Sequence, residues 1–435
     1  MPDSDSLLVM RNMTISPLQS IGRAVPLLLV AGCLALPEIA VAADGADNFK
    51  AFVGARIIDG TGKPAMEKAT ILVKNGRIAA VGQSVKVPAG AQQIDVSGKT
   101  IIPGLINAHG HVNEMSQLGL YARYGVTTVF SLGGDREIQL RDQTRSEQQT
   151  PAVSRARLFI AGPIPVSKTA EDARKAVDGL AAAKTDIVKF RLDDNLGRGT
   201  KMAPEVYTAI IDEAHQKGMR VAAHIVTLAD AKAVLRAGAD YIAHSVRDEE
   251  MDGEVIALLK KNKALYSPTL MRELSTFVYG EKPAFLSDPF LLKDGNKAEM
   301  AKAREPAFQE SMRNDKSGMW YKEHLPVAMR NLKKAEDAGI PVAMGTDTGP
   351  AYRFQGYFEH LELEHMTKAG LTPMQALVAS TSTAARCLKA ADQIGSLEVG
   401  KWADFAVLGA NPLDDIKNTR KLDAVWIAGN LVPAK

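Results

Sequence analysis

The chain has 435 residues, of which 46% are hydrophobic and 24% charged, a balance typical of globular proteins that bury a sizeable core. The formal net charge is +3, from 53 basic and 50 acidic residues. These values exclude a disordered chain, and the lack of a dense basic tract, with an aromatic content of 6%, argues against nucleic acid as a partner. Two cysteines exclude a disulfide framework and a cysteine-rich metal cluster.

Residues 1–42 predict an export signal. Arg11 and Arg23 precede an apolar run over 24–36, and an Ala-Val-Ala sequence ends at Ala42. A basic segment, a short apolar run and an A-x-A site are typical of secretory signal peptides, and the run is shorter than the roughly 20 residues that span a bilayer. We therefore expect no membrane span and a periplasmic or secreted protein cleaved near Ala42. The alternative is a lipoprotein anchored through Cys33, because the sequence Val-Ala-Gly-Cys ending there resembles a lipoprotein box.

Both ends of the mature chain have β-strand character. Two apolar runs, 69–73 and 78–81, flank an Asn-Gly pair, which is the strongest short-range hairpin signal. Further short apolar runs occur close to the C-terminus. Because neither end can bury a sheet face alone, the sequence predicts that 48–103 and 395–435 combine into one small β-sandwich.

Residues 104–394 predict an α/β fold, a TIM (β/α)8 barrel. Short β-branched runs alternate with helical segments, as in βα units of a parallel sheet. A stretch at about 271–320 is longer than one helical connection and predicts an insertion at the catalytic face, where the loops that follow the strands lie. The candidate strands are 104–109, 126–130, 157–160, 186–190, 220–224, 241–244, 264–267 and 341–344.

Metal-binding and ionisable residues follow several of these strands. His109 and His111 are two residues apart in the first strand, so both imidazoles point to the same side, which is the barrel interior. Lys189 has the same inward orientation in the fourth strand, between two apolar neighbours. Since the carboxyl ends of barrel strands meet at the catalytic face, we expect one site. Its members are His109, His111, Lys189, His224, His244 and Asp347.

These motifs resemble those of the metal-dependent amidohydrolase superfamily. The resemblance extends from about Phe52 to Val432, and its further motifs are the Pro-Gly-Leu-Ile-Asn-Ala-His-Gly-His run ending at His111, the Gly-Thr-Asp run ending at Asp347, and residues 395–407. Within the superfamily, residues 360–364 and 368–377 resemble the branch that contains imidazolonepropionase-like proteins and metal-dependent Xaa-Pro dipeptidases (prolidases).

The resemblance implies a centre of two divalent metal ions, usually zinc, bridged by an N6-carboxylated Lys189. Desolvation lowers the pKa of a buried amine, so this lysine can be neutral and capture carbon dioxide. A hydroxide between the metals would attack the substrate carbonyl, with Asp347 as general base and then general acid. The implied ligands are His109, His111 and Asp347 for one ion, and His224 and His244 for the other.

The function expected from this centre is hydrolysis of an amide bond in a small molecule, a dipeptide or an N-acyl amino acid. Arg191 shares the inward orientation of Lys189 and is predicted either to clamp a substrate carboxylate or to pair with a neighbouring aspartate, Asp193 or Asp194. Tyr352 and Arg353, in the loop after the eighth strand, are comparable substrate-binding candidates.

The sequence is also compatible with two other functions. The same metal centre could hydrolyse a lactone, carbamate, urea or organophosphate ester, because the same nucleophile attacks each of them. A more remote alternative is a non-catalytic barrel used for binding. A homo-oligomer is compatible with the sequence.

Overall fold

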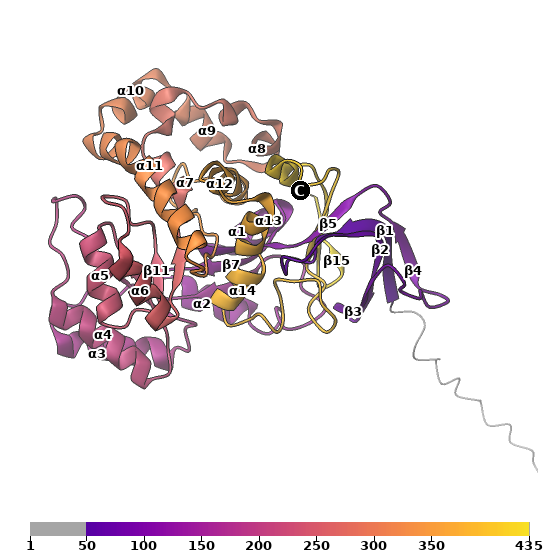
Figure 1. Cartoon of the computed structure of the whole chain (residues 1–435), viewed down its shortest axis with the longest axis horizontal. Helices are drawn as coiled ribbons and strands as arrows, with labels where there is room; N and C mark the ends of the chain where they lie inside the picture. The colour runs from indigo at the N-terminus through magenta and orange to yellow at the C-terminus, as the bar shows by residue number, and fades with distance from the viewer. Residues whose placement is uncertain (1–48, 435) are drawn as a thin grey trace, which may run out of the picture. The chain divides into compact units, whose positions relative to one another are not determined.

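The computed structural model describes residues 49–434 (Figure 1). The predicted signal peptide, with its cleavage site near Ala42 and the alternative anchor at Cys33, lies outside the described residues. Within the described part of the chain, no helix is long and apolar enough to cross a membrane.

Strands from the two ends of the described chain share one eight-stranded sheet, in the order β15-β14-β13-β5-β1-β2-β3 with β4 paired to β1. The contact between the ends is the antiparallel pair β5–β13, in which Pro103 lies opposite Phe405. The Asn-Gly hairpin is confirmed between β2 and β3, where both turn residues have a positive φ. The strands are β1 (Phe49–Ile57), β2 (Met66–Lys74), β3 (Arg77–Gly82), β4 (Gln92–Asp95), β5 (Thr100–Pro103), β13 (Phe405–Leu408), β14 (Leu422–Ile427) and β15 (Asn430–Leu431).

Seven of the eight candidate barrel strands form two parallel sheets, in the orders β6-β7-β8 and β12-β11-β10-β9. In the described chain the eighth candidate, 341–344, is not a full strand: the 341–348 segment forms single parallel bridges, Tyr266 to Val342 and Gly110 to Thr348. The fold is therefore α/β, and these pairings alone do not close a barrel. The strands are β6 (Leu105–Gly110), β7 (Val126–Ser131), β8 (Arg157–Ile160), β9 (Val188–Arg191), β10 (Val221–His224), β11 (Tyr241–Ala243) and β12 (Leu265–Ser267).

Helices alternate with these strands and bury their apolar faces in a shared core. Several begin at a side-chain cap: Thr169, Thr227 and Asp252 each accept a backbone N–H of the first turn. Each cap fixes the residue at which its helix begins and therefore the residue at which the preceding loop ends. The helices are α1 (Met115–Arg123), α2 (Glu137–Thr144), α3 (Ala170–Ala182), α4 (Pro204–Gln216), α5 (Leu228–Arg236), α6 (Gly253–Asn262), α7 (Leu270–Ser275), α11 (Lys316–Asp337), α12 (Tyr357–Lys368), α13 (Pro373–Ala379) and α14 (Ser382–Cys387).

The segment between β12 and α11 is helical and has an apolar cluster of its own. Tyr279 and Leu291 of this segment pack with Phe358 of α12, and Figure 1 shows α8, α9 and α10 grouped beside α11 and α12. The cluster holds the segment over the loop that follows residues 341–348. Its elements are η1 (Val278–Glu281), η2 (Ala284–Ser287), α8 (Pro289–Asp294), α9 (Lys297–Ala303) and α10 (Pro306–Asn314).

Candidate metal centre and active site

The structure brings His109, His111 and Asp347 together from opposite ends of the barrel sequence. Nε2 of His111 lies 2.8 Å from Oδ1 of Asp347, and Nε2 of His109 lies 3.6 Å from the same oxygen. One potential ligand atom from each residue lies within 4.8 Å of the others, a spacing suited to one metal ion. His109 and Asp347 are buried and His111 is half-buried, so an ion here would be largely screened from solvent.

Buried carboxylates hold this group in place. Nδ1 of His111 lies 3.0 Å from the carbonyl oxygen of Gly133, whose N–H donates to Glu137. This contact suits an Nδ1–H donor, a tautomer whose Nε2 lone pair would be available to a metal ion. Asp347 itself has φ of +58°, a strained conformation for a residue other than glycine. The hydroxyls on both sides of it, from Thr346 and Thr348, donate to the buried carboxylate of Glu359.

Lys189, His224 and His244 lie beside that group. Nζ of Lys189 is 3.3 Å from Nε2 of His109, and the ring of His244 lies 4.5 Å from that of His109 and 4.2 Å from that of His224, measured between centroids. Nδ1 of His244 contacts the Thr269 hydroxyl at 2.8 Å. All six residues expected at the site are therefore neighbours in one cluster.

The electrostatics of the cluster favour neutral nitrogen ligands. Burial lowers the pKa of His109 and His244 well below the usual value and lowers that of His224 to about 3. Burial likewise lowers the pKa of Lys189 to about 7. Neutral imidazoles and a neutral amine have free lone pairs, so this donor set fits divalent cations of the zinc type.

The pKa of Asp347 is set by opposing effects of burial and nearby charges. Burial by itself raises the pKa of its carboxyl, but the guanidinium of Arg353 and the two histidines outweigh burial and hold that pKa well below its usual range. Nη1 of Arg353 donates to Oδ2 of Asp347 at 2.6 Å. Asp347 is thus an anion whose second oxygen, Oδ1, faces His111.

The three expected substrate-binding residues differ in their placement. Arg191 lines the cavity, but its side chain is 46% exposed and its Nε donates to Asp193 at 2.9 Å. Arg353 lines the cavity and is bound to Asp347. Tyr352 does not line this cavity; its ring packs 4.6 Å from that of Phe308 in α10.

Two residues near the centre have places that the sequence did not predict. Oδ2 of Asp193, considered only as a partner for Arg191, lies 2.5 Å from Nε2 of His224. Arg272 in α7 lines the cavity and was missed, because the stretch that contains it was expected to be an insertion. A possible signal was its position just after the seventh candidate strand, where loops reach the catalytic face.

The site is a cavity of about 250 Å³, large enough for a small organic molecule. Leu132, Ile164 and Pro350 are apolar residues of the lining and make up the apolar wall of the cavity. A wider cavity of about 730 Å³, lined by residues of α1 and of the 294–299 segment, adjoins it through Pro350 and Arg353.

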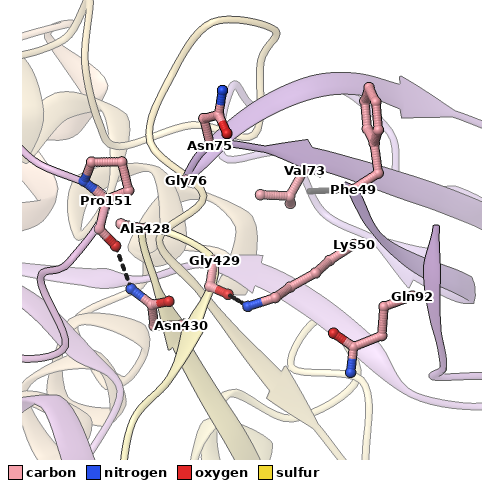
Figure 2. A pocket seen from close by; sticks show the side chains of 10 residues that line it. All are labelled: Phe49, Lys50, Val73, Asn75, Gly76, Gln92, Pro151, Ala428, Gly429 and Asn430. Atoms are coloured by element: carbon pink, nitrogen blue, oxygen red, sulfur yellow. Dashed lines mark hydrogen bonds between the residues drawn. The ribbon is translucent and has the colours of Figure 1, made fainter. Parts of the chain in front are cut away.

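Figure 2 shows a third cavity, on the eight-stranded sheet. In this cavity Nζ of Lys50 donates to the carbonyl oxygen of Gly429, and the side-chain amide of Asn430 donates to the carbonyl oxygen of Pro151. Both donors are thus used in joining strands and loops. The residues lining this cavity include none of the metal-binding cluster, so it is separate from the site.

Comparisons with known proteins identify the family of this chain. The profile of the amidohydrolase family matches residues 100–432. Ochratoxinase of Aspergillus niger is 28% identical over 284 residues, and the match covers 62% of this chain but only about half, 51%, of that enzyme. Imidazolonepropionase of Streptomyces avermitilis is 24% identical over 79% of this chain and 81% of its own length.

Solved structures show the same fold. A Bifidobacterium longum protein described provisionally as a prolidase is 28% identical, with a TM-score of 0.73 over 89% of this chain and 95% of its own. A Xaa-Pro dipeptidase with bound methionine in its active site has a TM-score of 0.69 over 88% and 99% of the two chains, at 21% identity. The resemblance seen in the sequence motifs is thereby confirmed at the level of the family.

Proposed function

The chain belongs to the amidohydrolase family, and we propose that it hydrolyses the amide C–N bond of a dipeptide or an N-acyl amino acid at a centre of two divalent metal ions. The observation that supports this function most directly is the cluster of four histidines, Lys189 and Asp347 around one cavity of about 250 Å³. A cavity of this size suits a molecule of two small residues rather than a folded protein.

The ligands in this proposal come from five loops and strand ends. We assign His109, His111 and Asp347 to one ion and His224 and His244 to the other, with zinc as the metal. Lys189, whose burial favours the neutral amine, would bridge the ions as a carboxylysine. When bound, the ions supply Lewis-acid polarisation of the carbonyl and lower the pKa of water.

The chain's own residues supply positioning and proton transfer. Asp347 Oδ1 faces the site, where it can accept a proton from the attacking water and return it to the departing amine. Arg353 holds the other carboxylate oxygen, which fixes the orientation of Asp347. The apolar wall of Leu132, Ile164 and Pro350 limits the number of water molecules beside the scissile bond.

The finer features of the fold belong to the same proposal. We infer a closed eight-stranded barrel in which residues 341–348 complete the ring, because Ala108 N–H donates to Met344 and Ala343 N–H donates to Tyr266, at 2.8 and 2.9 Å. The composite domain of 48–103 with 395–435 would then be separate from the 104–394 barrel. The 271–320 insertion would cover part of the barrel mouth.

The deciding experiment is a substrate panel assayed with purified enzyme in the presence of zinc and bicarbonate. The panel contains dipeptides, N-acyl amino acids, lactones, carbamates, ureas and organophosphate esters, and a chelator-treated sample is the control. We expect turnover of carboxylate-bearing amides, lost on chelation. Preference for an uncharged lactone or carbamate would replace the amide function by the alternative, and chelator-resistant turnover would contradict the metal centre.

Export also belongs to the proposal and is tested separately. N-terminal sequencing of the mature protein should find a start just after Ala42. A lipid-modified Cys33 would instead indicate an anchored form, and an uncleaved chain would contradict both interpretations.

A further inference from the structure

Two buried arginines, Arg247 and Arg272, share one glutamate, Glu273, beside the cavity that Arg272 lines. Glu273 in α7 bonds Nη1 of Arg272 through Oε2 at 2.9 Å, and its Oε1 lies 2.8 Å from Nη1 of Arg247. The side chains of Arg247 and Glu273 are each 1% exposed, and that of Arg272 is 11% exposed. Both guanidiniums lie near the ring of Tyr321, at 4.2 Å for Arg272 and 5.5 Å for Arg247.

The charges of this cluster do not balance. It contains two guanidinium groups and one carboxylate, and an unpaired buried charge is costly because it loses its hydration. Arg247 does not line the cavity, but Arg272 does. Arg272 therefore presents the excess positive charge to the site, where an anion could neutralise it.

The other two arginines of the cavity have partners already. Arg191 directs Nε and Nη2 to Asp193, and Arg353 directs Nη1 to Asp347 and Nε to the Ser275 hydroxyl. Among the described residues, Arg272 has no carboxylate partner besides Glu273. Its guanidinium keeps donors for a planar, two-oxygen acceptor, the geometry for which arginine is best suited.

We propose that Arg272 binds the free carboxylate on the amine side of the substrate, held in position by Glu273 and Tyr321. This assignment rests on the proposed amide hydrolysis and replaces Arg191 as the residue that reads the carboxylate. The apolar wall of Leu132 and Ile164 lines the same cavity, so the substrate class is an amide whose leaving amino acid has an apolar side chain and a free carboxylate.

The test measures binding of the product, so it does not depend on turnover. Calorimetric titration of the zinc-loaded full chain with each L-amino acid and its carboxamide gives the preference for the acid over the amide. For apolar amino acids the wild type should prefer the acid by about 30- to 150-fold, the ratio expected for a charge-assisted, two-point hydrogen bond worth about 2–3 kcal/mol. Arg272→Gln should lower this preference to near unity, while Arg191→Gln should leave most of it.

Folding of the variants is controlled by circular dichroism and by metal content, which should match the wild type. If Arg272→Gln fails to fold, Arg272→Lys keeps the charge beside Glu273 but loses the two-point geometry, and its preference should fall by about tenfold or more. A preference that survives in the folded Arg272 variant, or is lost in Arg191→Gln instead, overturns the assignment. So does a wild type that prefers no acid over its amide.

The two proposals can fail separately. If the wild type binds apolar amino acids through Arg272 but cleaves no amide in the substrate panel, amide hydrolysis is wrong and the carboxylate site is right. If the wild type cleaves amides and this cleavage does not depend on Arg272, amide hydrolysis is right and the carboxylate site is wrong.

Discussion

Replacing Lys189 with methionine should stabilise the metal-free protein. Lys189 is 2% exposed, and burial lowers its pKa from 10.5 to about 7. In the unfolded chain the amine is fully hydrated and keeps a pKa of about 10.4. At neutral pH folding must therefore remove a proton or bury a charge, and either costs free energy. Methionine has similar length and no charge, so the variant avoids this cost.

The size of the effect follows from the two pKa values. At about pH 7 the cost to the wild type is about 4 kcal/mol, and at about pH 9.5 it is about 1 kcal/mol. Between about pH 7 and 10.5 the unfolded state binds more protons than the folded state, so wild-type stability rises with pH in this window. The advantage of Lys189→Met should thus be largest at neutral pH and nearly vanish above the unfolded pKa.

Urea denaturation followed by circular dichroism, with chelator and in carbonate-free buffer, measures this difference. Lys175→Met is the matched control, because Lys175 is 67% exposed on α3 and its only ion pair among the described residues is with Glu171. The control should show no pH-dependent gain. A Lys189→Met protein that is less stable than the wild type at both pH values, or a gap that does not narrow as pH rises, would refute the reasoning.

Three further outcomes are expected. Lys189→Ala should lose one or both metal ions by elemental analysis, with formate or propionate partly restoring activity by replacing the carbamate; wild-type metal content would contradict the bridge. Glu273→Gln should lower the free energy of unfolding by about 3–5 kcal/mol, because it leaves two buried guanidiniums without an anion, whereas exposed Glu254→Gln should change it little. Burial raises the pKa of Glu362 to about 8, so the folded state binds more protons and stability should fall as pH rises from about 4.5 to 8; denaturation of Glu362→Gln should lack this component, and an equal slope in both proteins would contradict it.

Much of the candidate site could be predicted because it depends on local periodicity. His109 and His111 share a face since side chains alternate along a strand, and Lys189 points inward since its two neighbours are apolar. The carboxyl ends of parallel strands lie at one edge, so residues that end successive strands are neighbours even when far apart in sequence. The eighth candidate strand was less predictable, because residues 341–348 make single bridges rather than a continuous ladder.

By itself, the sequence determined the α/β character, the hairpin at Asn75-Gly76 and the set of metal-binding candidates, all of which follow from spacing within short segments. Only the tertiary structure decided which charges pair. In the folded chain Asp193 contacts both Arg191 and His224. Glu273 is buried and contacts both Arg272, its neighbour in sequence, and the more distant Arg247. The strength of an ion pair depends on distance and burial, which are set by the packing of segments far apart in the chain. For that reason the sequence left two roles open for Arg191, binding a substrate carboxylate or pairing with a neighbouring aspartate, and only the folded chain shows its ion pair with Asp193.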